Sequence, residues 1–268
     1  MMITSLVQTL ENQRTGGAFA VPAIELTAGI RNKFSLDFKE TCDEAPALPE
    51  GAAKLRLSLR GMPAMERSLA TFGDAVCTSM PVEVSVVVPA KLRRGYYFLH
   101  AVVLDDSDTP IGVYQAYAVV DKQADPIADN HLALRVIRAA LGDLFAGDNE
   151  MLGFQEFATG DIAAAVERSL LTWNSRPPFT SAYIGNNFPY PEILLTGVSY
   201  ELLQATVNRL ERNRNQYQAG GLATDLERRA DYYAKKMAEY RTLWFNGVTS
   251  IKQTEDENAF SGSLQYGN

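Results

Sequence analysis

The first half of the chain carries the alternating pattern of β-strands. Apolar side chains occupy every second position in three runs, which are Phe34, Leu36 and Phe38, then Leu55, Leu57 and Leu59, then Val82, Val84 and Val86. Successive side chains of a strand point to opposite faces of its sheet, so each run predicts a strand with one buried and one wet face. Gaps that contain proline separate the runs and indicate turns.

Two longer apolar runs follow, over residues 96–104 and 111–120. The link between them reads Asp-Asp-Ser-Asp-Thr-Pro, and these short polar side chains with a proline favour a turn. The two runs therefore predict a β-hairpin near the centre of a sheet. Together with the shorter strands, they indicate an antiparallel, immunoglobulin-like β-sandwich over residues 24–122, preceded by an N-terminal arm over residues 1–23.

The hydrophobic period becomes helical after residue 129. Leu132, Val136, Ile137, Ala140, Leu141 and Leu144 share one face of a first predicted helix. Asp161 is expected to cap a second helix, which Pro177 and Pro178 end. A third is predicted from Pro191 to about Gln218, and Thr224 with Glu227 forms a capping box for a fourth.

In the last two predicted helices, apolar residues recur at spacings of three and four positions. They are expected to form a long antiparallel helical hairpin with arms of roughly 20 to 27 residues, or ~30 to 40 Å. The fold class is thus α+β, with a helical connector domain over residues 129–248. Residues 249–268 are polar and show no core period, which predicts an extended tail that takes its order from a neighbouring molecule. The monomer is expected to stay folded without this tail.

The composition excludes some classes of function but does not identify one. The chain has 268 residues, 46% of them hydrophobic, which suffices for one large domain or two ordinary ones. A formal net charge of −7 argues against general nucleic-acid binding, which needs clustered Lys and Arg. No apolar run has the ~20 residues of a membrane span, and no secretory pattern opens the chain. These features favour a chain that is made, and at first kept, in a cytoplasm.

Catalytic and metal-binding patterns are absent from the sequence. His100 is expected to be a satisfied or edge histidine of a strand, and His131 to face solvent at the start of a helix. Asp105, Asp106 and Asp108 lack the glycine and distal glutamate of a calcium loop, so a solvated turn is expected. Cys42 and Cys77 form no CxxC pair; two reduced thiols are expected, and a disulfide between them stays open. We therefore expect no enzyme, no cofactor and no metal.

Several residues of the back half are candidates for contacts with other chains. The basic stretch on the third predicted helix is either a solvated face or a contact with an acidic surface of another subunit. Adjacent Tyr232 and Tyr233 cannot share one helix face, so one of them can face a partner, unless both are half-buried in the bundle. The candidate interface residues are Arg209, Arg212, Arg214, Tyr217, Tyr232, Trp244, Ile251, Lys252 and Tyr266.

Six short motifs of the back half stand in a fixed order. They include Asp-Ile-Ala-Ala-Ala-Val at residues 161–166, Trp-Asn-Ser-Arg-Pro-Pro at 173–178, Phe-Pro at 188–189, Leu-Leu-Thr-Gly-Val at 194–198 and Arg-Asn-Arg-Asn-Gln-Tyr-Gln-Ala-Gly-Gly at 212–221. This order resembles that of a family of tailed-bacteriophage virion proteins, the neck or head-to-tail connector proteins. The resemblance covers about residues 130–268 and leaves the β-rich half outside it.

The resemblance implies a structural adaptor in the virion neck, synthesised in the cytoplasm of a host bacterium. Identical subunits would form a homo-oligomeric ring between the portal protein and the tail or other neck proteins. DNA would pass through the lumen without sequence-specific binding. The ring copy number, the neighbour at each face, the lumen-facing residues and the role of the sandwich stay open.

Two other functions are weighed against the neck connector. The helical hairpin would also serve a tail-terminator or baseplate protein. A glycan- or receptor-binding module on the β-sandwich would need aromatic residues on its loops, and the stretch 61–80 offers only Phe72.

Overall fold

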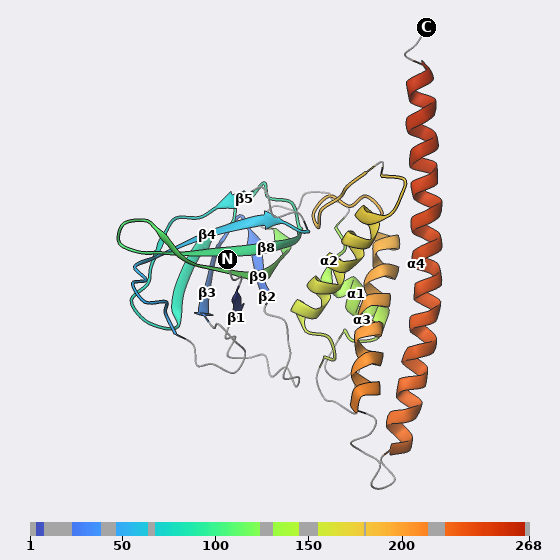
Figure 1. Ribbon diagram of the computed structural model, residues 1–268, viewed down its shortest axis with the longest axis horizontal. Helices are drawn as coiled ribbons and strands as arrows, with labels where there is room; N and C mark the ends of the chain where they lie inside the picture. Colours follow the sequence, from blue (N-terminus) through green and yellow to red (C-terminus); the bar gives the residue numbers. More distant parts are fainter. Residues whose placement is uncertain are drawn as a thin grey trace.

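The computed structural model describes residues 4–7, 23–38, 47–63, 68–123, 131–144, 155–179, 181–213 and 223–265. Within these residues all strands precede all helices, which confirms the mixed α+β class (Figure 1). The strands are β1 (Thr4–Val7), β2 (Ala23–Ala28), β3 (Arg31–Phe38), β4 (Lys54–Gly61), β5 (Ser68–Thr71), β6 (Ala75–Val76), β7 (Val82–Val87), β8 (Gly95–Leu104) and β9 (Pro110–Gln123). The helices are α1 (Leu134–Leu141), α2 (Thr159–Ser175), α3 (Pro191–Asn213) and α4 (Ala223–Gln265).

The predicted central β-hairpin is confirmed. Strands β8 and β9 pair antiparallel, and they lie in the middle of the strand order β5-β4-β8-β9-β1-β3-β7. The turn between them is held by Asp105, whose Oδ1 accepts the backbone N–H groups of Ser107 and Thr109, both at 2.8 Å. Asp108 has a φ of 62° and pairs with Lys54 at 2.9 Å. Asp105 and Asp108 therefore hold the turn, and residues 106–110 are exposed, which agrees with the expected solvated turn.

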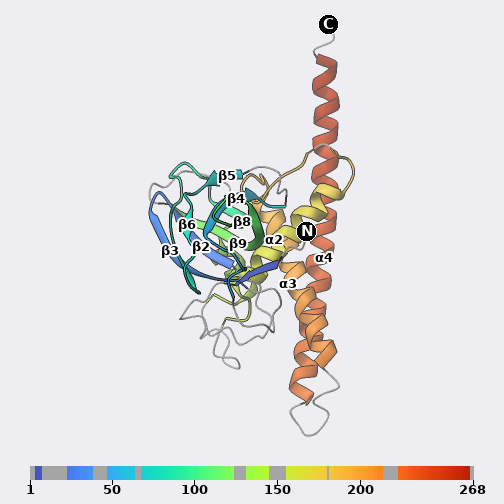
Figure 2. The same cartoon turned by 60° about the vertical axis from the view of Figure 1, so that its left-hand side comes forward.

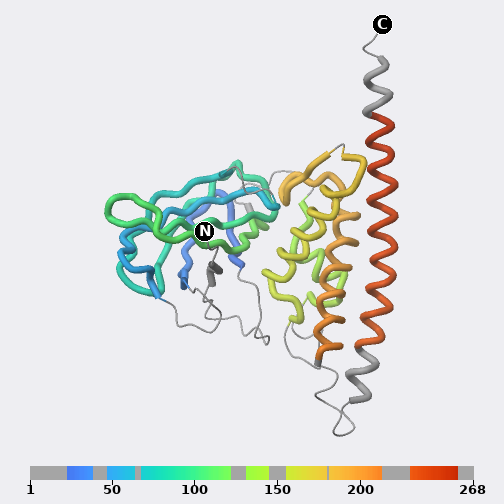
Figure 3. The backbone as a smooth tube through the Cα atoms, viewed as in Figure 1, coloured from blue at the N-terminus to red at the C-terminus, as the bar shows by residue number. Residues whose placement is uncertain are grey.

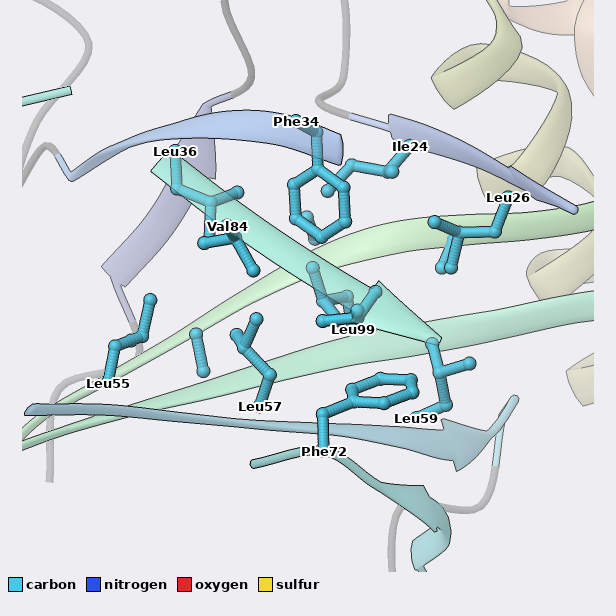
Figure 4. Packing of buried hydrophobic residues seen from close by; sticks show 14 of the residues in the cluster. Ile24, Leu26, Phe34, Leu36, Leu55, Leu57, Leu59, Phe72, Val84 and Leu99 are labelled. Atoms are coloured by element: carbon cyan, nitrogen blue, oxygen red, sulfur yellow. The ribbon is translucent and has the colours of Figure 1, made fainter. Parts of the chain in front are cut away.

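Two layers of strands enclose the first hydrophobic core. Strands β3 and β7 supply one side, and β2, β4, β8 and β9 supply the other, with their side chains pointing toward one another (Figure 4). All three predicted alternating runs lie buried in this core. The period-two pattern thus placed the inward face of these strands correctly.

A second core joins the sheet to the helices. Because side chains of β8 alternate, Tyr96 and Phe98 point away from the first core, and they pack with Val119 of β9 against helix α2 and its neighbours. Strand β8 is therefore buried on both faces, which explains its almost uninterrupted apolar sequence. The strand half and the helical half share this second core.

Helices α3 and α4 lie side by side and run in opposite directions (Figures 1 and 2). Their close approach depends on Gly197, because a Cβ there would lie 2.8 Å from Cδ2 of Trp244. The Trp244 side chain is fully buried at this crossing. The link between the two helices, residues 214–222, lies outside the described residues.

The predicted extended tail is wrong for most of its length. Helix α4 continues without a break to Gln265. Ile251, Lys252 and Glu255 of the predicted tail contact the rest of the chain, beside which α4 runs in Figure 3. The contacting residues Val248, Ile251, Lys252 and Glu255 keep the helical spacing of three and four. Lys252 and Glu255 are charged, so a pattern of apolar residues alone does not include them. The helix predicted from that pattern therefore ends too early, at Val248.

Smaller corrections concern the buried face of α1 and the first residues of α2 and α4. Val136 was predicted on the apolar face of the first helix, but it is 42% exposed, whereas Leu134 and Ile137 are buried. Helix α2 begins at Thr159, so Asp161 lies in its first turn and accepts the N–H of Ala158 at 3.3 Å. Helix α4 begins at Ala223, which places Thr224 inside it.

We predict that Gly197→Ala destabilises the fold, although alanine favours a helix by ~1 kcal/mol over glycine. The added methyl group would press on the buried Trp244 ring, and such overpacking costs about 1 to 3 kcal/mol. Urea denaturation of both proteins measures the difference in free energy of unfolding.

Gly247→Ala in α4 is the matched control for this prediction. Its Cβ would also come within 2.8 Å of a neighbour, but that neighbour is Cδ1 of Ile193, the end of a flexible side chain. This variant should stay close to wild type. Equal stability of the two variants would contradict a tight Gly197–Trp244 contact.

Candidate functional site

Residues from several of the back-half motifs meet at one place. There the end of α2, the segment 176–190, the start of α3 and the middle of α4 surround an aromatic cluster. The ring centroid of Trp173 lies 4.9 Å from Phe188, 5.7 Å from Tyr190, 6.1 Å from Tyr183 and 6.4 Å from Trp244. The cluster gives the segment 176–190 an apolar base.

Asn174 fixes this segment from the side of α2. Its Nδ2 donates to the carbonyl of Tyr183, and its Oδ1 accepts the N–H of the same residue, both at 2.9 Å. A side-chain amide that pairs both backbone groups of one residue sets the distance and the orientation of that residue together. Asn174 therefore ties the end of α2 to the backbone of Tyr183.

Lys252 fixes the segment from the side of α4. The residue is fully buried, and its Nζ donates to the carbonyls of Arg176 at 2.6 Å and Pro178 at 3.2 Å. Burial lowers the pKa of Lys252, and the negative charge of Glu255 opposes this shift. Helix ends leave carbonyl groups without intrahelical donors, so the ammonium supplies donors just beyond the end of α2.

Glu255, one turn further along α4, accepts three hydroxyl groups. Ser181 donates at 2.6 Å, Tyr190 at 2.8 Å and Tyr183 at 3.0 Å. Burial, with the hydrogen bond and charge of Glu255, raises the pKa of Tyr190 to about 12. We call Asn174, Lys252 and Glu255 the clamp residues.

The clamp holds one large apolar side chain out of the core. Phe179 lies between Pro178, which Lys252 contacts, and Ser181, which Glu255 contacts, yet its side chain is 75% exposed. Aromatic side chains held in a fixed position are typical anchors of protein interfaces, because little conformational entropy is lost when they bind. The arrangement is suited to docking.

At the opposite end of α3 and α4, Glu156 joins the two helices. Its carboxylate accepts the Tyr233 hydroxyl at 2.7 Å and pairs with Arg209 at 3.5 Å. Tyr233 thus faces inward, while its neighbour Tyr232 is 59% exposed. This agrees with the first of the two alternatives for the tyrosine pair.

The structure separates the predicted interface residues into two groups. Arg209, Arg212 and Tyr232 are exposed and remain open to a partner. Trp244 and Lys252 are fully buried within the subunit, so their assignment as interface residues is wrong, whereas Ile251 is half-buried against the second core and stays a prediction. Their helical period faces the body of the same chain. Arg214, Tyr217 and Tyr266 lie outside the residues whose side chains are described.

The residues that sequence reasoning missed are Asn174, Phe179 and Glu255. Asn174 and the two prolines before Phe179 belong to a motif that the sequence singled out, but their contacts depend on α4. Glu255 could have been found as the third of three positions, after Val248 and Lys252, at helical spacing.

The expectation of a satisfied or edge His100 is wrong, because β8 is a central strand and the buried Nδ1 of His100 has no hydrogen-bond partner. His100 is 9% exposed, and burial together with the charge of Arg60 lowers its pKa. The expectation that His131 faces solvent is wrong: its side chain is 3% exposed and its Nε2 lies 2.9 Å from Oδ1 of Asp121. Cys77 is buried, and burial raises its pKa, whereas Cys42 lies outside the described residues. Over the part of the chain that the structure describes, no group of three or more His, Cys, Asp or Glu could hold a metal.

We predict that Lys252→Met lowers the free energy of unfolding by about 1 to 3 kcal/mol, because the carbonyls of Arg176 and Pro178 lose their donor. Methionine retains an unbranched apolar stem in the same space. Gln253→Met, on the exposed side of the same turn, is the control and should be neutral within ~0.5 kcal/mol. Urea denaturation of both variants makes the comparison, and an unaffected Lys252→Met protein would contradict the clamp.

We also predict a loss of stability at alkaline pH through Tyr190. Its ordinary pKa is 10.0, whereas the folded value is about 12. Between these values the folded state keeps a proton that the unfolded state has lost, so the free energy of unfolding falls as the pH rises. Below pH 10 this contribution is fully present.

Thermal melts of wild type and Tyr190→Phe between pH 10 and pH 12 test this titration. The variant should show a shallower decrease of Tm with pH. Tyr232→Phe changes a tyrosine outside the clamp and should keep the wild-type slope. Identical slopes for all three proteins would refute the role of Tyr190.

Comparisons with known proteins leave the family of this chain open. No protein-family model matches the sequence, and no curated protein matches it. Among solved structures, fibronectin(III)-like modules of CbhA from Clostridium thermocellum align with 45% of this chain and 99% of theirs, at 11% identity and a TM-score of 0.24. At that score the likeness assigns neither fold nor function. Among the described helices, none has the length and apolarity to cross a membrane.

Proposed function

We propose that this chain is a structural protein of a tailed-phage virion, a neck connector subunit that forms a ring between the portal and the tail. The observation that carries the proposal is the geometry of α4. This helix has 43 residues, or ~65 Å at 1.5 Å per residue, and it rises past the other described elements (Figures 1 and 3). The rest of the chain covers only part of α4, so the remaining surface of this helix is available to neighbouring subunits.

The clamp adds a mechanical argument. Trp173, Asn174, Pro178, Phe188 and Gly197 all belong to motifs that carry the resemblance to neck proteins. Their side chains and backbone meet in contacts that stiffen the end of α2 against α3 and α4. Such contacts suit a subunit that transmits force between the head and the tail of a virion.

In this proposal α3 and α4 form the predicted helical hairpin, and the strands form an immunoglobulin-like sandwich. The second core, where Tyr96 and Phe98 meet the helices, would keep the sandwich at a fixed angle to the hairpin. The sandwich would then lie at the outside of the ring or between neighbours. With a net charge of −7, the ring would let DNA pass without gripping its phosphates.

We predict that the purified full-length chain, alone or with its portal protein, forms closed rings with a central channel. Mass photometry gives the number of copies, and class averages from electron microscopy show the channel. A chain that stays monomeric in both preparations at micromolar concentration would overturn the proposal.

Immunogold labelling of virions that contain this chain separates the neck from the other virion positions. Label at the junction of head and tail supports a neck connector. Label confined to the distal end of the tail would favour a tail-terminator or baseplate role. Glycan-array binding by the full-length chain without ring formation would favour the receptor-binding alternative.

A further inference from the structure

We propose that copies of this chain join head to tail, with the clamp end of one copy docked on the Arg209 end of the next. The inference rests on the proposed function, since it names the contact that would close the ring. Two surfaces are involved. The tip surface consists of Phe179 and Asp256; the base surface consists of Arg209, Arg212 and Tyr232.

The tip surface combines an aromatic ring with negative charge. Glu255 and Asp256 lie three and four positions after Lys252, so both lie near the side of α4 on which Lys252 and Glu255 contact the segment 176–183. Phe179 is exposed on this segment, and Asp256 is exposed on α4. The ring is already exposed, with Lys252 bound to the carbonyl of Pro178 on one side of it and Glu255 bound to the Ser181 hydroxyl on the other.

A guanidinium group is the chemical partner that fits such a surface. Arginine pairs with carboxylates through a planar set of donors, and the same plane stacks on an aromatic ring. A lysine ammonium would satisfy the charge but not the stacking. The tip surface is therefore expected to select an arginine-bearing partner.

The base surface offers arginines in a suitable arrangement. Arg209 and Arg212 are three positions apart on α3, so both lie on one side of the helix, and both are exposed. Arg209 is steadied by the buried carboxylate of Glu156 while 53% of its side chain stays exposed. Arg212 has no ion-pair partner among the residues that the structure describes. Tyr232 adds an exposed aromatic ring from α4, beside the inward-facing Tyr233.

The two surfaces cannot meet within one chain. Contacts of the base involve Tyr233, and those of the tip involve Glu255 and Asp256, which lie more than twenty positions further along the same straight helix (Figure 2). At 1.5 Å per residue the two ends are ~35 Å apart. Complementary surfaces at opposite ends of a rigid subunit pair only between copies, and such a contact closes into a ring where the rotation permits. We therefore assign the partner of the tip surface as a second copy of this chain.

Charge reversal in the full-length chain tests this contact. Asp256→Arg makes the tip basic, and Arg212→Glu makes the base acidic. Each variant alone should lose assembly, with an apparent Kd raised about tenfold or more, because like charges then face each other. Phe179→Ala should weaken assembly without changing its dependence on salt.

Mixing the two charge variants in equal amounts is the decisive measurement. The basic tip of one variant then faces the acidic base of the other, and the remaining contact keeps its wild-type charges. Assembly should return with equal numbers of both chains, and the double variant should also assemble alone. Lys33→Glu and Glu83→Arg, on the exposed faces of β3 and β7, are control reversals that should assemble like wild type. Circular dichroism and thermal melts verify that every variant is folded.

The outcomes separate this inference from the proposed function. If wild type forms rings and folded Asp256→Arg and Arg212→Glu variants form them equally well, the head-to-tail contact is wrong and the ring proposal stands. The same holds if both variants lose assembly and their mixture does not regain it. If wild type forms no ring alone or with its portal protein, both fail.

Discussion

A buried ammonium group needs acceptors, and Lys252 finds them in the backbone carbonyls of Arg176 and Pro178. This contact fixes the chain direction after α2 and holds α4 against the body of the molecule at the same point. Glu255 continues the contact one turn later, with the hydroxyls of Ser181 and two tyrosines. Polar contacts in a largely apolar surrounding are specific in geometry, because a displaced partner would leave a buried group unsatisfied. The position of Phe179 follows from this constraint.

Strand β8 plays the corresponding part in the other half. Its inward side chains complete the core between the two strand layers, and its outward side chains Tyr96 and Phe98 complete the core beneath the helices. Together with β9, whose Val119 also lies in the second core, this strand couples both cores. Gly95 and Gly185 reinforce the junction by close backbone contact, since Tyr96 donates its N–H to the carbonyl of Gly185 at 3.1 Å. The β-rich half is therefore positioned by the same segment that the clamp holds.

For assembly, the important consequence is stiffness between distant surfaces. The base surface is tied to α4 through Glu156 and Tyr233, and the tip surface is tied to it through the clamp. Both are thus attached to one helix, whose length sets the distance between them. Ring contacts made through such a subunit would have a defined angle, which closure requires.

The sequence by itself determined the strand pattern, the central hairpin, the helical back half and the exposed arginines Arg209 and Arg212. These features follow from local periods of two and of three to four, which record the side of an element that faces a core. It did not determine that Trp244 packs inside the subunit, that Lys252 and Glu255 belong to the fold, or that Phe179 stands exposed. Those outcomes depend on contacts between residues more than forty positions apart, and a local period does not identify the distant partner. Only the tertiary structure decided them, because a charged residue reads as a surface residue until its distant partners are known.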